Sequence, residues 1–141
     1  MRFWDSSAIV PLLVEESGTR TARDLFAADA EMVVWWATLV ECMSSIARCE
    51  HDGTSPSATR VLAARWTEVS PSDAVRADAR RLLRLHELRA ADALQLAAAR
   101  ALCDGAPDGF PLVTNDRRLA AAATREGFDV IDPLGEPRSG V

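Results

Sequence analysis

Five short apolar runs are spaced along the chain and predict the strands of a sheet. They are Arg2–Trp4, Met32–Trp36, Trp66–Val69, Pro111–Thr114 and Phe128–Ile131. Apolar runs of this length are typical of strands. The unbroken apolar character of Met32–Trp36 indicates a strand that is buried on both faces, whereas Trp66–Val69 is predicted to be an edge strand.

The stretches between these runs carry the start and stop signals of helices. Serine followed by proline, which favours a capped helix start, occurs at Ser55-Pro56 and again at Ser70-Pro71. His51-Asp52-Gly53 is predicted to end the helix before the first of these pairs, and Pro11 makes the geometry of the first helix irregular. Helices are expected over residues 7–14, 19–28, 38–50, from 55 onward, 70–86, 88–99 and 115–127.

Strands that alternate with helices predict the α/β class, with a central, mostly parallel sheet of four to five strands flanked by helices on both faces. The 141 residues are enough for one domain with a buried core. We expect this domain to span residues 1–132, and the proline- and glycine-containing residues 133–141 to form a flexible tail. No internal repeat or second domain is evident.

Charge and cysteine content narrow the functional classes. The net charge of −5 and a pI near 5.0 argue against a basic nucleic-acid binder and suit a site that holds cations. All 16 basic residues are arginine, whose guanidinium group fits phosphate well.

Three cysteines without C-x-x-C spacing, and no long apolar segment, favour a cytoplasmic protein with no membrane contact. His51 and His86 stand alone, so a histidine-based zinc site is not expected.

Three acidic residues are predicted to meet at one edge of the sheet. Asp5 ends the first strand, Glu41 follows the second, and Asp116 follows Pro111–Thr114. The carboxyl ends of parallel strands share one edge, which is where open α/β sheets bind ligands. Asp92 lies in the first turn of its helix, but no strand directly precedes it, so the pattern alone cannot place it.

Each acid also has a purely structural interpretation. Thr38 and Glu41 match a capping box, in which Thr38 caps the helix and Glu41 reaches back to the backbone. Asp92 could simply complement the helix dipole, and Asp116 could cap the following helix. Taken one at a time, these interpretations are as good as the functional one.

Four motifs in order resemble a PIN-domain ribonuclease and, more narrowly, a VapC-type toxin of a bacterial toxin–antitoxin pair. They are Asp5-Ser6-Ser7-Ala8, Thr38-Leu39-Val40-Glu41, Ala91-Asp92-Ala93-Leu94-Gln95-Leu96-Ala97 and Thr114-Asn115-Asp116-Arg117-Arg118-Leu119. The resemblance runs from Arg2 to about Asp132. It places Asp92 with the other three acids.

The resemblance implies an endoribonuclease that hydrolyses RNA phosphodiester bonds with metal-activated water. Crowded carboxylates must protonate or take up a cation, and oxygen ligands favour Mg²⁺ or Mn²⁺. Asp5, Asp92 and Asp116 would be the main metal ligands, and Glu41 would bind a second ion or orient the water. Two further residues, Ser6 and Thr114, would hydrogen-bond the ligands or the phosphate.

The resemblance also implies partners: a homodimer, and a hetero-oligomer with a VapB-type antitoxin laid across the active-site groove. We expect an apolar docking surface to include Trp4, Leu12, Leu13 and Phe26. Arg89, Arg117 and Arg118 could pair with RNA phosphates or remain solvated on the surface. For the pair Trp35-Trp36, one ring in the core and one under a helix is favoured over base stacking.

Other functions stay open on the sequence. A PIN nuclease for RNA processing without an antitoxin would share the same acids, and a catalytically silent PIN-like module would use the acidic edge only to bind a partner. A receiver-like phosphoacceptor domain would require a lysine near the site, and the chain has none. A haloacid-dehalogenase-like phosphatase would require Asp at the position that Ser7 occupies.

Overall fold

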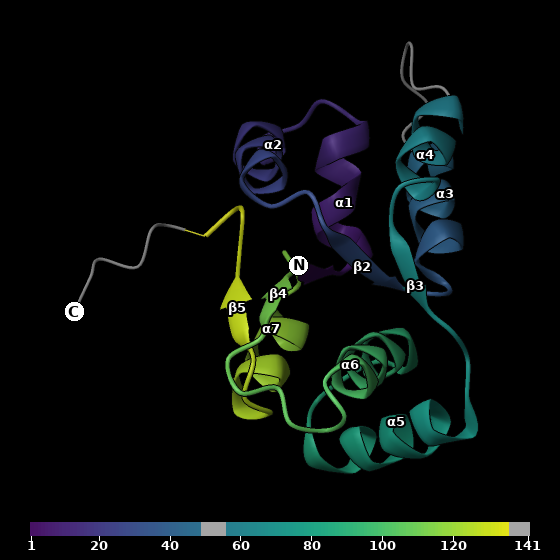
Figure 1. The fold of residues 1–141 in the computed structure, drawn as a ribbon, viewed down its shortest axis with the longest axis vertical. Helices are drawn as coiled ribbons and strands as arrows, with labels where there is room; N and C mark the ends of the chain where they lie inside the picture. The colour runs from purple at the N-terminus through teal and green to yellow at the C-terminus, as the bar shows by residue number, and fades with distance from the viewer. Residues whose placement is uncertain (49–55, 136–141) are drawn as a thin grey trace, which may run out of the picture.

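Five parallel strands form the central sheet of the computed structural model, which describes residues 1–48 and 56–135 (Figure 1). The sheet order is β3-β2-β1-β4-β5, and every neighbouring pair runs parallel. The α/β class and the five-stranded sheet are as predicted, and the third run is the expected edge strand. The strands are β1 (Arg2–Trp4), β2 (Met32–Trp35), β3 (Thr67–Val69), β4 (Pro111–Val113) and β5 (Asp129–Ile131).

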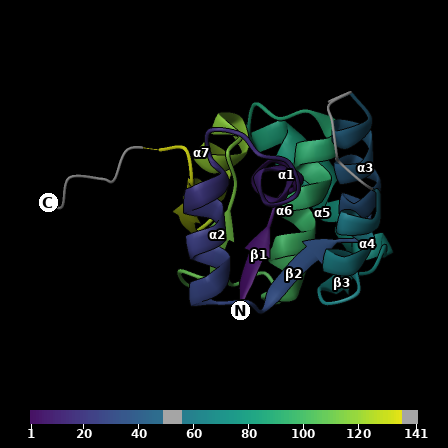
Figure 2. The same ribbon diagram turned by 90° about the horizontal axis from the view of Figure 1, so that it is seen from above.

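Helices cover both faces of the sheet (Figures 1 and 2). One group packs on one face and consists of α1 (Ser6–Leu13), α2 (Thr19–Ala28), α3 (Thr38–Arg48) and α4 (Pro56–Ala63). The other group packs on the opposite face and consists of α5 (Asp73–Leu85), α6 (Ala90–Leu102) and α7 (Arg117–Arg125). No helix of the described residues is both long and apolar enough to cross a membrane.

Strand side chains alternate between two hydrophobic clusters, as the twofold period of a strand requires. Phe3 on β1 belongs to the cluster under α5–α7, whereas the next residue, Trp4, belongs to the cluster under α1–α4. Leu112 and Val113 on β4 divide in the same way. All four side chains are fully buried, which fixes the strand register and therefore the ends of the strands.

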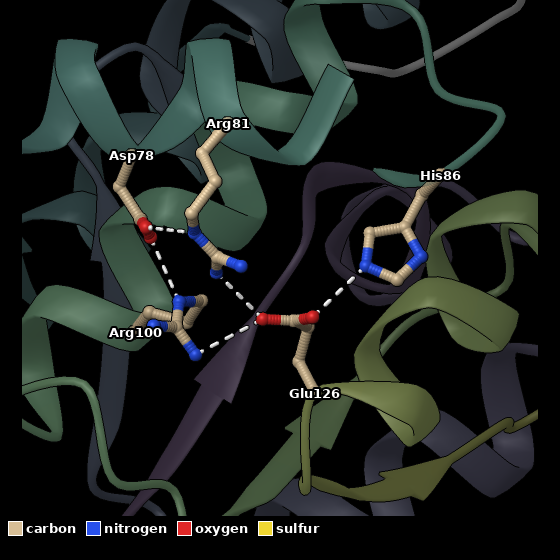
Figure 3. A network of polar contacts seen from close by, with 5 residues as sticks. All are labelled: Asp78, Arg81, His86, Arg100 and Glu126. Carbon is tan, nitrogen blue, oxygen red and sulfur yellow. Dashed lines mark hydrogen bonds and ion pairs between the residues drawn. The ribbon is translucent and has the colours of Figure 1, made fainter. Parts of the chain in front are cut away.

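A partly buried ion-pair network ties together the three helices on one face (Figure 3). Glu126, the C-cap of α7, accepts hydrogen bonds from Arg81 of α5 at 2.7 Å and contacts Arg100 of α6 at 3.1 Å. His86 lies 2.9 Å from the same carboxylate, and Asp78 pairs with both arginines. Burial alone would raise the pKa of Glu126, but the hydrogen bonds from Arg81 and His86 lower it.

Four local predictions are wrong. Helix α5 is capped by Ser72, whose hydroxyl accepts from the Val75 amide at 3.1 Å, so Ser70-Pro71 lies outside the helix. The Trp36 side chain is not covered by a helix, because it is 56% exposed and rests edge-on against buried Trp35. Trp4 is fully buried, so it cannot belong to a docking surface.

The fourth wrong prediction is the capping box. Helix α3 includes Thr38, and the Glu41 amide donates to the Ala37 carbonyl at 3.1 Å rather than to the Thr38 hydroxyl. The Glu41 side chain turns toward α6 instead, as described below. The predicted helix end at His51-Asp52-Gly53, the Ser55 cap, Cys49 and residues 136–141 of the predicted tail lie outside the described residues.

Candidate functional site

Asp5 occupies the point where the sheet order reverses. In the sheet, β2 and β3 lie on one side of β1, and the later strands β4 and β5 lie on the other side. At such a switch point the connections leave the central strand in opposite directions, which opens a crevice at its carboxyl end. The Asp5 amide donates to the Val113 carbonyl at 2.9 Å, so Asp5 lies beside the end of β4.

Two hydroxyl groups fix the Asp5 carboxylate. Ser7 Oγ donates to Oδ2 at 2.6 Å, and Thr114 Oγ1 donates to the same oxygen at 2.8 Å. Ser6 Oγ reaches Oδ1 at only 3.5 Å, which is the outer limit of a hydrogen bond. Thr114 therefore makes the predicted contact, whereas Ser7 holds Asp5 more closely than Ser6 does.

Pro11 contributes to this arrangement from within α1. In a regular helix the residue at position 11 would donate its amide to the carbonyl of Ser7, but proline has no N–H. The freed Ser7 carbonyl accepts from Asn115 Nδ2 at 3.0 Å, and the Asn115 amide donates to Ser7 Oγ at 2.9 Å. The start of α1 is thus joined to the segment that follows β4.

Glu41 is held by a residue of α6. Gln95 Nε2 donates to Glu41 Oε1 at 2.7 Å and to Thr38 Oγ1 at 3.0 Å. Gln95 is 1% exposed, and its own carbonyl oxygen has no hydrogen-bond partner among the described residues. This amide joins α3 to α6 and therefore brings Glu41 toward the helix that carries Asp92.

Asp92 and Asp116 line one open pocket together, so the structure places Asp92 at the same edge. Asp92 lies half-buried in the first turn of α6, the helix that leads into β4. Asp116 is the N-cap of α7, and its Oδ1 accepts from the Leu119 amide at 2.9 Å. The expected cap is therefore present at Asp116.

Structural and ligand-binding roles use different oxygens of these carboxylates. Asp5 employs Oδ2, Glu41 employs Oε1 and Asp116 employs Oδ1 in the hydrogen bonds above. Within residues 1–48 and 56–135, the second oxygen of Glu41 and of Asp116 makes no hydrogen bond, and that of Asp5 makes only the long contact from Ser6. Each side chain can therefore be oriented by the fold and still offer an oxygen to a ligand.

The negative charges of the acids at this edge repel one another. Burial raises the pKa of Asp5, the nearby Asp116 adds to the rise, and the Ser7 and Thr114 hydrogen bonds oppose it. Burial also raises the pKa of Glu41 to about 7, with further contributions from Asp5 and Asp92. Burial, then Asp116 and Asp5, raise the pKa of Asp92 to about 6. A divalent cation would relieve this repulsion.

The oxygen atoms of the site are of the chemical type that binds a hard divalent cation. The four elements carry carboxylate oxygens to one edge of the sheet, and among the described residues the carbonyl oxygens of Gln95 and Asn115 are buried without a hydrogen-bond partner. Among the described residues, no three acidic, histidine or cysteine side chains are arranged closely enough to hold an ion as they stand. Binding of an ion would thus require the carboxylates to move closer together.

Three residues of the site were not predicted from the sequence: Ser7, Gln95 and Asn115. A signal for two of them was present. Pro11 lies four residues after Ser7 in a predicted helix, which marks the Ser7 carbonyl as available to another donor. Gln95 falls on the same helix face as Asp92, three residues later, and a buried glutamine requires a polar partner.

The sequence matches the family model described as the PIN domain over residues 2–125, and the chain belongs to the PIN-domain family. No curated protein matches the chain. Solved structures of low sequence identity share the fold.

Three solved structures resemble this chain at low sequence identity. A toxin–antitoxin complex from Klebsiella pneumoniae aligns with a TM-score of 0.72 and 17% identity, covering 95% of this chain and 98% of that one. VapC20 of Mycobacterium tuberculosis is described as a toxin that cleaves the sarcin–ricin loop. It aligns with a TM-score of 0.67 and 20% identity, covering 86% of this chain and 95% of that one. VapBC2 of Rickettsia felis, bound to a fragment of its promoter DNA, aligns with a TM-score of 0.59 and 12% identity, covering 93% of this chain and 97% of that one.

Proposed function

We propose that this PIN domain is a metal-dependent endoribonuclease that acts as the toxin of a toxin–antitoxin pair. The observation that carries the proposal is the convergence of Asp5, Glu41 and Asp92, all with raised pKa values, at the switch point of the sheet. Folding gains nothing from this crowding, whereas a site for a divalent cation requires it. The family membership and the toxin-like neighbours support the same activity.

In this mechanism Asp5, Asp92 and Asp116 would hold one or two Mg²⁺ or Mn²⁺ ions, with Glu41 beside them. When bound, such an ion polarises the phosphate and lowers the pKa of an attacking water. Ser7 and Thr114 keep Asp5 in one orientation, as partners of metal ligands commonly do. Glu41, whose Oε2 makes no hydrogen bond among the described residues, can orient the water and accept its proton.

We further propose a VapB-type antitoxin and a homodimer as partners. The toxin–antitoxin complexes among the structural neighbours support the antitoxin. The expected apolar surface excludes buried Trp4. Its other three members are partly accessible on α1 and α2: Leu12, Leu13 and Phe26. A charged substitution at Leu13 is expected to weaken one of these assemblies, as measured by light scattering with and without the antitoxin.

The test compares growth and total RNA after induced expression of the wild type, Asp5→Asn and Asp92→Asn. Asparagine keeps the shape and removes the charge that a divalent ion needs. Asp24→Asn is the matched control, because Asp24 is exposed on α2 and has no ion pair among the described residues. Growth arrest with RNA cleavage in the wild type and the control, but in neither site variant, is the expected result.

Two other outcomes would redirect the proposal. RNA cleavage without growth arrest would favour an RNA-processing nuclease over a toxin. A purified wild type that leaves RNA intact with both Mg²⁺ and Mn²⁺ would reject the nuclease and leave a binding module whose acidic edge holds a partner.

A further inference from the structure

Two site carboxylates share their pocket with three arginines. The pocket has a volume of about 460 Å³ and lies where the first turns of α6 and α7 meet. Its lining residues are Arg89, Ala91, Asp92, Asp116, Arg117 and Arg118. Opposite charges therefore line one cavity, without forming ion pairs across it.

The three arginines are exposed, and none makes an ion pair within the part of the chain that the structure describes. Arg89 is the N-cap residue of α6, and its guanidinium group, which carries only donors, cannot cap the helix amides. Arg81 and Arg100, by contrast, are both paired with acids in the network of Figure 3. The guanidinium groups of the pocket are thus free to bind an anion.

We propose that Arg89, Arg117 and Arg118 bind backbone phosphates of a single-stranded RNA next to the phosphate that is cleaved. This inference rests on the proposed function and adds the location of the substrate track. Guanidinium groups bind phosphate oxygens through paired, charge-assisted hydrogen bonds. On a strand whose scissile phosphate lies at Asp92 and Asp116, the neighbouring phosphodiesters are the anions closest to these arginines.

An RNA phosphate suits this pocket better than an acidic peptide does. Asp92 and Asp116 repel a carboxylate and a phosphate alike unless a cation neutralises them, and under the proposed function that cation is bound together with the scissile phosphate of an RNA. The strand would thus lie across the α6–α7 side of the carboxylates, away from Glu41 and Gln95. The overall charge of −5 makes this local group of arginines the means of holding a polyanion.

The test measures binding of a fluorescent single-stranded RNA by anisotropy over a range of NaCl concentrations, with Ca²⁺ in place of Mg²⁺ and the RNA shown intact on a gel. The variant is Arg117→Gln/Arg118→Gln. The matched control is Arg80→Gln/Arg84→Gln, which removes the same charge from exposed, unpaired positions on α5. Thermal unfolding of both proteins checks that they fold.

Loss of two phosphate contacts is expected to reduce the slope of log affinity against log salt by about 1.4, which weakens binding about 25-fold at 0.1 M salt. The control should bind within twofold of the wild type. Arg89→Gln alone should lower the slope by about 0.7.

An Arg117→Gln/Arg118→Gln variant that binds RNA like the control would overturn the inference. If the wild type still cleaves RNA in that case, the proposed nuclease stands and the arginines serve another partner, such as a protein. A wild type that neither binds nor cleaves RNA would reject both the inference and the proposed function.

Discussion

Replacement of Glu41 by Gln should stabilise the metal-free protein while it impairs the proposed site. The carboxylate is half-buried, and its pKa of about 7 means that the folded state penalises its ionised form. Glutamine keeps an oxygen that can accept the hydrogen bond from Gln95 Nε2, now 2.7 Å from Glu41 Oε1. The substitution therefore removes mainly the buried charge.

The size and pH dependence of this effect follow from linkage. The folded pKa lies above the ordinary value of 4.5, so the native state binds more protons and the wild type loses stability as pH rises from about 4.5 through 7. The full shift would correspond to roughly 3 kcal/mol. Because Glu41 is only half-buried, solvent screening reduces the expected gain for Glu41→Gln at pH 8 to about 1–2 kcal/mol.

Thermal unfolding in EDTA measures this gain. At pH 8 the Glu41→Gln variant should melt about 3–6 °C above the wild type, and the difference should nearly vanish at pH 4.5. Glu87→Gln is the control, because Glu87 is exposed and has no ion pair among the described residues. It should leave the melting temperature unchanged at both pH values.

Addition of Mg²⁺ should reverse the order of the two proteins. An ion at a hundred times its dissociation constant stabilises the folded wild type by about 2.7 kcal/mol, which exceeds the advantage of the variant, and the variant should gain less than the wild type does. A variant that is no more stable at pH 8, or that gains equally at pH 8 and pH 4.5, would refute the electrostatic account of the site.

Substitutions at Asp116, Glu126, Ser7 and Ser6 separate local roles within the fold. Asp116→Asn should retain the cap of α7, whereas Asp116→Ala should lower the free energy of unfolding by about 1 kcal/mol in urea; both should lose RNA cleavage. Glu126→Gln should destabilise the protein by about 2 kcal/mol at pH 7, because Arg81 and Arg100 lose one of their two carboxylate partners and keep only Asp78. Because the pKa of Glu126 is lowered, this difference should shrink as pH falls through the carboxylate range, as followed by urea unfolding at pH 7 and pH 3. Ser7→Ala should weaken Mg²⁺-induced thermal stabilisation, whereas Ser6→Ala should leave it nearly unchanged; equal effects of the two would contradict the role given to Ser7.

The sheet could be predicted because its signals are local. Each strand is a short apolar run, and alternate side chains belong to opposite clusters, as with Phe3 and Trp4. Local signals misled at some helix starts. The serine–proline pattern predicted that α5 starts at Ser70-Pro71, but the Ser72 hydroxyl makes the capping bond.

The position of Asp92 depends on topology, which the local pattern does not contain. Two helices, α5 and α6, separate β3 from β4. A helix that leads into a parallel strand runs opposite to it, so the first turn of α6 meets the carboxyl edge of the sheet. The same argument applied to the sequence would have placed Asp92 beside Asp116 without the resemblance to a family. The contact from Gln95 to Glu41 could not be foreseen, because it depends on how α6 is rotated against α3.

The chain has the means to neutralise partly buried acids and does so at one place but not at the other. Around Asp78 and Glu126, two arginines and a histidine satisfy both carboxylates, and the pKa of Glu126 is lowered. No arginine among the residues that the structure describes forms an ion pair with Asp5, Glu41, Asp92 or Asp116. Three arginines line the pocket of the last two acids and still leave them unpaired. A site shaped only by stability would close such pairs, since an unpaired buried charge costs several kcal/mol. The charge that balances these four acids is therefore expected to come from outside the chain, as a divalent cation.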